Sequence, residues 1–243
     1  MEKKNISRAK NFMGIAPVQY RPNFPMATLT GSDISLDRIG SLFSETHSII
    51  KQEASRNNFL KEFTAYKIVQ IYTHASDSSD NNEPVIYFAD SLLYLSELIP
   101  DTKPLTQLVV LSACETGNGA EYQGEGVFSF NRAFAALGVA SSVANLWPID
   151  NRSTYKLTEF FYKYIAEGLP LDIALQRAKL EFIKTSAERE QLPYYWSSGI
   201  LVGKTNGILL NKKTGHLSYY MVALLISMLA TGLLILFLRR KRV

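Results

Sequence analysis

Short apolar runs alternate with amphipathic segments along most of this chain, and this alternation limits the folds that it can adopt. Predicted strands cover 12–18, 66–73, 85–88, 105–111, 139–146 and 199–203, and predicted helices cover 31–51, 54–63, 127–137, 151–167 and 170–186. The segment 92–99 has room for one or two helical turns, and Ser32 or Asp33 is a plausible cap for the helix over 31–51. Strands that alternate with helices of this length form a mostly parallel sheet covered on both faces. We therefore expect an α/β domain.

The segment 108–126, LVVLSACETGNGAEYQGEG, joins one of these strands to a glycine-rich loop. It contains Cys114, the only cysteine of the chain. A thiol at the carboxyl end of a buried strand lies where open α/β sheets form their ligand crevice. His74 ends the predicted strand 66–73 in the same way, in IVQIYTHAS. Because the carboxyl ends of parallel strands meet at one edge of the sheet, we expect His74 and Cys114 to face the same crevice.

Two interpretations of Cys114 are open at this point. Cysteine hydrolases need an imidazole near the thiol, so a lone cysteine opposite a histidine fits a catalytic dyad. A lone cysteine in a strand is also often a small buried apolar side chain. The other histidines are less suggestive, since His47 falls inside the predicted helix 31–51 and His216 adjoins the apolar C-terminal segment.

Several other chemistries are excluded by composition and spacing. One cysteine and scattered histidines do not make a metal site, so we expect no metal. The glycines of the 117–126 loop fit neither G-x-G-x-x-G nor the P-loop, so we expect no nucleotide cofactor. The basic residues at 239–242 account for the whole net charge of +4. The remainder is neutral, and we expect no nucleic-acid partner.

The C-terminal segment 217–238 contains no charged residue. A helix of this length crosses the roughly 30 Å of a bilayer's hydrocarbon. Tyr219 and Tyr220 lie where an interfacial aromatic belt would be. The sequence thus predicts a single-pass membrane protein. The basic tail favours its own placement in the cytoplasm, whereas the lack of a visible export signal equally fits a tail anchor with a cytoplasmic domain.

The chain is accordingly divided into four parts. The predicted folded domain covers 9–210, a linker 211–216, a transmembrane helix 217–238 and a basic tail 239–243.

Several motifs occur in an order that resembles the CHAT family. They are THA at 73–75, SACETG at 112–117, GEG at 124–126, LWPID at 146–150 and PYYW at 193–196. CHAT domains are caspase-like, are related to caspases, separases and gingipains, and are often attached in bacteria to tetratricopeptide repeats. The resemblance runs from about Phe12 to Leu210.

This resemblance implies a caspase-like three-layer sandwich and the chemistry of a cysteine endopeptidase. Cys114 would be the nucleophile, and His74 would activate it and protonate the leaving amine. The backbone amides of Ala75 and Cys114 match the positions that stabilise the oxyanion. Relatives usually carry glycine after the histidine, so Ala75 is a departure from the pattern. The implied partners are a protein substrate, the membrane and a regulatory chain such as a repeat protein.

Asp150 matches the residue that in separase-like relatives lies near the pocket for the residue before the scissile bond. A carboxylate there would favour Arg or Lys through a charge-assisted pair. The equal alternative is that Asp150 caps the helix that follows it. At the level of function, the alternative to a peptidase is a catalytically silent caspase-fold module for scaffolding or signalling.

Overall fold

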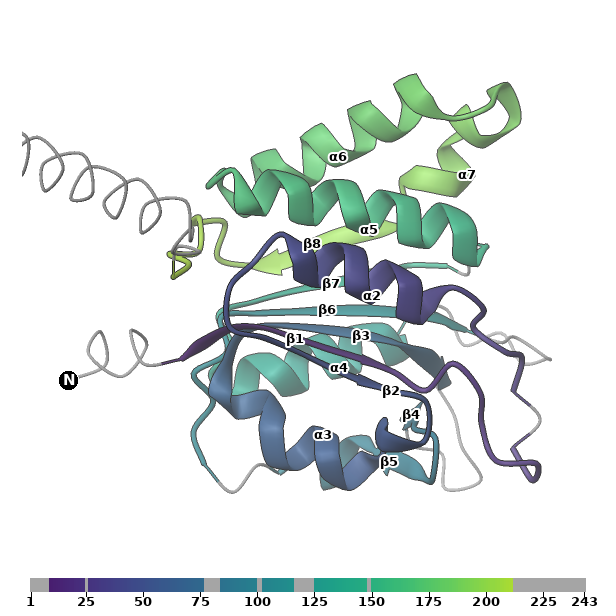
Figure 1. Cartoon of the computed structure of the whole chain (residues 1–243), viewed down its shortest axis with the longest axis vertical. Coiled ribbons are helices and arrows are strands. Elements are labelled where there is room, and N and C mark those ends of the chain that lie inside the picture. Colours follow the sequence, from purple (N-terminus) through teal and green to yellow (C-terminus); the bar gives the residue numbers. More distant parts are fainter. Residues whose placement is uncertain are drawn as a thin grey trace, which may run out of the picture. The chain divides into compact units, whose positions relative to one another are not determined.

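The centre of the domain is one sheet, shown in Figure 1. The computed structural model describes residues 9–24, 26–76, 84–99, 102–115, 125–147 and 150–211. Within these residues the sheet has eight strands, with the order β2-β1-β3-β6-β7-β8, and β4 pairs with β3 while β5 pairs with β4. The strands are β1 (Lys10–Ala16), β2 (Thr46–Ile50), β3 (Tyr66–Ser76), β4 (Val85–Tyr87), β5 (Leu92–Tyr94), β6 (Leu108–Glu115), β7 (Ser141–Asn145) and β8 (Gly199–Gly203).

Pairing in the main sheet is parallel except at its last strand. β2, β1, β3, β6 and β7 run in parallel, and β8 is antiparallel to β7. The helices are α2 (Ser32–Ser41), α3 (Arg56–Glu62), α4 (Glu125–Ala136), α5 (Asn151–Ala166), α6 (Leu171–Thr185) and α7 (Pro193–Trp196). Short 3-10 turns are η1 (Lys51–Glu53), η2 (Phe63–Ala65), η3 (Leu95–Glu97) and η4 (Glu188–Gln191).

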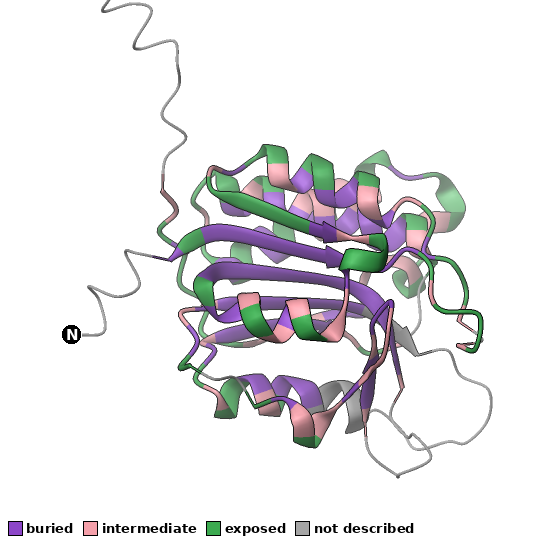
Figure 2. Cartoon of the chain, turned by 60° about the horizontal axis from the view of Figure 1, so that its bottom comes forward, coloured by how far each residue is buried: buried purple, intermediate pink, exposed green. Residues whose placement is uncertain are grey.

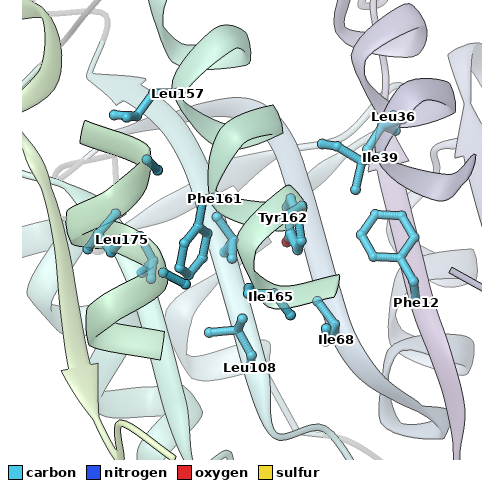
Figure 3. Packing of buried hydrophobic residues seen from close by; sticks show 14 of the residues in the cluster. Phe12, Leu36, Ile39, Ile68, Leu108, Leu157, Phe161, Tyr162, Ile165 and Leu175 are labelled. Carbon is cyan, nitrogen blue, oxygen red and sulfur yellow. The ribbon is translucent and has the colours of Figure 1, made fainter. Parts of the chain in front are cut away.

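Helices cover both faces of the sheet, because the central strands are apolar on both. Side chains alternate between the faces with a period of two residues. Along β3, Ile68 and Tyr72 join the core under α2, α5 and α6, whereas Val69 and Ile71 join the core under α3 and α4. Figure 2 shows the strands as almost continuously buried, and Figure 3 shows Tyr162 of α5 lying over the first of these cores. The predicted α/β fold with a mostly parallel sheet is confirmed.

The predicted helix over 31–51 is wrong beyond residue 41. α2 ends at Ser41, and 46–50 form the edge strand β2, whose residues pair in register with β1. Ile49 and Ile50 prolong a helical apolar pattern, but on β2 they pack on opposite faces of the sheet. His47 therefore lies on a strand. The N-cap of α2 is Gly31, with φ of 89°, rather than Ser32 or Asp33.

Two other features depend on backbone conformation. The segment 92–99 forms β5 and a 3-10 turn rather than helix alone. The helices predicted over 127–137 and 151–167 end at Ala136 and Ala166, just before Gly138 and Gly168, and both glycines have the left-handed conformation that closes a helix, with φ of 93° and 87°.

The structure contradicts the predicted membrane localisation. Among the described residues no helix is long and apolar enough to cross a bilayer. α5, for example, has 16 residues and would span only about 24 Å, and its surface carries Lys156 and Lys163. The segment 217–238, on which the prediction rested, lies outside the described residues.

A buried polar cluster fastens the end of the domain to the amino-terminal edge of the sheet. Lys67 of β3 is 2% exposed, and its Nζ donates hydrogen bonds to the carbonyl oxygen of Leu209 at 2.9 Å, to Asn211 Oδ1 at 2.9 Å and to Asn11 Oδ1 at 3.3 Å. Asn11 Oδ1 also accepts from the Asn211 N–H at 2.8 Å. Burial lowers the pKa of Lys67, against a smaller opposing effect of Glu45. These bonds hold 209–211 beside β1 and β3.

Replacing Lys67 with methionine tests this cluster. The variant keeps a long, unbranched side chain but removes the three hydrogen bonds of the ammonium group, so we expect a loss of roughly 1–3 kcal/mol of unfolding free energy in urea. The matched control is Lys61→Met on the exposed surface of α3, which we expect to change stability by less than about 0.5 kcal/mol. Equal stability of the two variants would contradict the role of the cluster.

Candidate active site

The carboxyl ends of β3 and β6 bring His74 and Cys114 together. The two strands are parallel neighbours, and His74 and Cys114 are register partners in that pair. Neighbouring strands lie about 4.8 Å apart, so the two backbones are adjacent at the carboxyl edge of the sheet. The side chain of Cys114 and the loop 116–124 lie outside the described part of the structure. Contact between the thiol and the imidazole therefore stays a prediction.

The His74 ring is oriented by a backbone carbonyl. His74 is 4% exposed, and its Nε2 lies 2.8 Å from the carbonyl oxygen of Ala27, in the loop between β1 and α2. A carbonyl oxygen only accepts, so Nε2 must carry the proton and, in the neutral ring, Nδ1 must be the acceptor. Nδ1 is buried and has no hydrogen-bond partner among the described residues. In the neutral ring, Nδ1 is therefore the nitrogen that can accept a proton.

Tyr20, from the same loop, supports His74 from a second direction. Its hydroxyl accepts from the His74 N–H at 3.2 Å, and its ring centroid lies 5.3 Å from that of the imidazole. The hydroxyl also bonds Thr73 Oγ1 at 3.1 Å, and Thr73 Oγ1 donates to the carbonyl of Tyr87 on β4. Burial raises the pKa of Tyr20 to about 12, so its hydroxyl stays protonated at neutral pH. This chain of bonds fixes the backbone of β3 at the site.

Desolvation controls the charge of His74. Burial lowers the pKa of the imidazole below its ordinary value, and the hydrogen bond to the Ala27 carbonyl opposes this effect without overcoming it. A neutral ring at pH 7 with Nδ1 unprotonated can accept a proton. This is the state that a general base requires.

The methyl group of Ala75 is accommodated by the core. Ala75 is 5% exposed and is the register partner of Ile86 on β4 and of Glu115 on β6. Its side chain joins the apolar cluster under α3 and α4, in which Ile86 also lies. A glycine is therefore not required after His74 in this chain.

Asp150 caps α5. Its Oδ1 accepts from the Ser153 N–H at 3.0 Å, and its carbonyl accepts from the Thr154 N–H at 3.1 Å. Asp150 is exposed. Of the two sequence-based interpretations, the cap is the one that the structure contains, and a role in substrate binding stays a prediction.

Tyr20 and Ala27 are the residues of this site that the sequence did not indicate. Ala27 acts through its carbonyl oxygen, which every residue type has, so no side-chain pattern can reveal it. Tyr20 lies in an irregular segment between a strand and a helix, where periodicity gives no information. The one available signal is a tyrosine close after the end of a buried strand.

Comparison with known proteins places the chain in a family. A family model for the CHAT domain matches residues 7–204. Among solved structures, RgpB of Porphyromonas gingivalis, in a complex of its pro- and mature domains, matches with a TM-score of 0.52 and 9% identity over 86% of this chain and 53% of that one. The Arg-specific cysteine proteinase gingipain R matches with a TM-score of 0.50 and 10% identity, over 86% of this chain and 52% of that one.

Caspase-1 from Spodoptera frugiperda matches with a TM-score of 0.48 and 10% identity, over 86% of this chain and 92% of the caspase. No curated protein matches the chain. At these identities the gingipain structures are evidence of the fold alone. This chain spans about half of their length. The fold is thus that of the caspase-like α/β proteins. Within that class, the chain belongs to the CHAT domain family.

The lowered pKa of His74 can be tested by titration. We expect its ring resonances in NMR to titrate with a midpoint below 6.5, the ordinary value for histidine. The unfolded chain then binds a proton that the folded chain resists, so the unfolding free energy should fall as the pH drops below about 6.5. Urea unfolding above and below pH 6.5 measures this loss of unfolding free energy, and His74→Gln, which has no imidazole to titrate, should lose less. A midpoint at or above 6.5 would be contrary to this expectation.

Proposed function

We propose that this protein is a cysteine endopeptidase that uses Cys114 as nucleophile and His74 as base. The observation that carries the proposal is the register pairing of these two residues on β3 and β6, with Nδ1 of His74 left as the unprotonated nitrogen. Residues in register on neighbouring parallel strands present their side chains to the same face of the sheet. The thiol and the imidazole would then meet at its carboxyl edge.

In the proposed reaction, Nδ1 takes the thiol proton and the thiolate attacks the carbonyl carbon of the scissile peptide bond. The backbone amides of Ala75 and Cys114 would donate hydrogen bonds to the resulting oxyanion. The imidazolium, held by its Nε2–H on the carbonyl of Ala27, then gives its proton to the leaving amine. Water hydrolyses the remaining thioester and regenerates the thiol.

A carbonyl partner makes this base weaker than one held by a carboxylate. The Ala27 carbonyl carries no full charge, so it stabilises the imidazolium less than an ion pair would. Since burial also disfavours the charged ring, the resting site would hold a neutral thiol and a neutral imidazole. Activity would then depend on the loop that carries Tyr20 and Ala27, which is a basis for regulation by a partner such as a repeat protein.

For specificity, we propose a preference for Arg or Lys before the scissile bond. One fold neighbour is an Arg-specific cysteine proteinase. Asp150 is exposed just before α5, after the carboxyl end of β7, and Oδ1 is the oxygen that caps the helix. The other oxygen would receive the basic side chain.

Hydrolysis of a peptide library tests the assignment of the dyad. Cys114→Ala and His74→Ala should each lower the rate by at least about a thousandfold, because neither residue works without the other. The matched control is His47→Ala on β2, whose ring bonds Glu62 at 2.8 Å and should not matter. If the protein cleaves no peptide, or if Cys114→Ala retains full activity, the proposed dyad is contradicted. A protein that cleaves nothing would favour the alternative of a catalytically silent scaffolding or signalling module.

Asp150→Asn separates the two roles of this side chain. Asparagine is as good an N-cap as aspartate, so stability should stay within about 0.5 kcal/mol. The carboxylate charge is lost, and kcat/KM for substrates with Arg or Lys before the cleaved bond should fall about tenfold or more, while other substrates are unaffected. Unchanged preference in this variant would leave Asp150 with its capping role alone.

A further inference from the structure

A cavity of about 470 Å³ lies between α2 and α5, two helices that run side by side on one face of the sheet (Figure 1). Its walls come from α2, from the first three turns of α5 and from the residues that lead into α2. α2 follows the carboxyl end of β1, and α5 follows that of β7. The cavity is therefore near the edge of the sheet at which His74 lies, but it contains none of the site residues described above.

Positive charge dominates the walls of this groove. Arg38, Arg152 and Lys156 line it with Glu159 as the single carboxylate. Arg38 makes a loose ion pair with Glu159 at 3.4 Å, with the arginine side chain 65% exposed. Lys156 lines the groove, but its ammonium group donates to the carbonyl of Thr185 and to a neighbouring serine hydroxyl, both at 2.8 Å, at the end of α6 and away from the groove. Arg152 is exposed and has no ion pair among the described residues.

The same groove also offers apolar surface. Ile34, on the exposed side of α2, is 57% accessible and forms part of the wall. The buried ring of Tyr155 forms another part, edge-on to Tyr72 of β3 with ring centroids 4.9 Å apart. A ligand that fits both the charge and the apolar wall carries a carboxylate next to a large apolar side chain.

We propose that this groove binds an acidic segment of a partner protein, with a glutamate or aspartate on Arg152 and an adjacent apolar side chain against Ile34. Charge complementarity selects such a segment over a basic or neutral one. A free anion would leave the apolar wall unfilled. Binding a peptide is therefore a better match than binding a small inorganic ligand.

A peptide bound in the groove would affect His74 because the groove and the His74 ring contact the same short segment of the chain, residues 27–31. Thr30 and Gly31 line the groove, and the carbonyl of Leu29 accepts from the Tyr155 hydroxyl at 3.4 Å. Two residues earlier, the Ala27 carbonyl orients the His74 ring. A segment that moves this wall would change the environment of His74, and the consequence for peptide hydrolysis rests on the proposed function.

Fluorescence anisotropy with a labelled short peptide of alternating leucine and glutamate tests the groove. The protein is the full chain with Cys114→Ala, so that no hydrolysis interferes. We expect saturable binding that weakens at high salt, and about tenfold or greater weakening in Arg152→Gln. The matched control is Arg177→Gln, at an exposed position of α6 outside the groove, which should bind as tightly as the parent.

A second peptide, with glutamine in place of each glutamate, should bind at least about tenfold more weakly. Equal binding of the two peptides, or equal binding by Arg152→Gln, would overturn the site. NMR of the His74 ring during the same titration should show a shift as the acidic peptide saturates the protein. Bound peptide without such a shift would overturn the link to His74. Neither result depends on peptidase activity, so a failure of the proposed function is seen separately.

Discussion

The pairing of β3 with β6 is the constraint on which the rest of this structure depends. It aligns Ile68 with Leu108 at one end and His74 with Cys114 at the other. Both strands are buried on both faces, so a slip of one residue would move every apolar side chain into the wrong core. The same packing energy that fixes the core therefore fixes which residue lies opposite Cys114. The candidate site thus owes the alignment of its two backbones to the hydrophobic register.

What the register cannot supply is the orientation of the imidazole, and the loop between β1 and α2 supplies it. Tyr20 holds the His74 backbone, and Ala27 holds the ring nitrogen. Burial lowers the pKa of the ring, and the hydrogen bond to an uncharged carbonyl opposes this effect without overcoming it, so the ring is neutral at pH 7. The carbonyl partner also makes the base sensitive to the position of a surface loop. The groove between α2 and α5 begins at the end of this loop, with Thr30 and Gly31. The residues that line the groove therefore follow directly in the chain after the residue that orients His74.

The main strands could be predicted because each is a strong local signal. The runs that became β3 and β6 are apolar on both faces, and Gly138 and Gly168 mark helix ends through their backbone conformation alone. The edge strand β2 was missed because two adjacent isoleucines satisfy a helical pattern as well as a two-sided strand. Ala27 could not be predicted, since a carbonyl leaves no trace in the sequence. Membrane localisation was inferred from apolar length in a segment that lies outside the described residues, and the described helices do not bear it out.

The central claim is that His74 acts on Cys114. Because Cys114 is the only cysteine, the rate of alkylation of the protein by iodoacetamide reports on this thiol alone. An isolated thiol has a pKa of about 8.5 and is mostly protonated at pH 7, but a neutral imidazole next to it can take the proton as the sulfur attacks the reagent. The account predicts that at pH 7 the protein reacts about tenfold or more faster than His74→Gln, and that the two rates converge above about pH 9. Equal rates at pH 7 would contradict it.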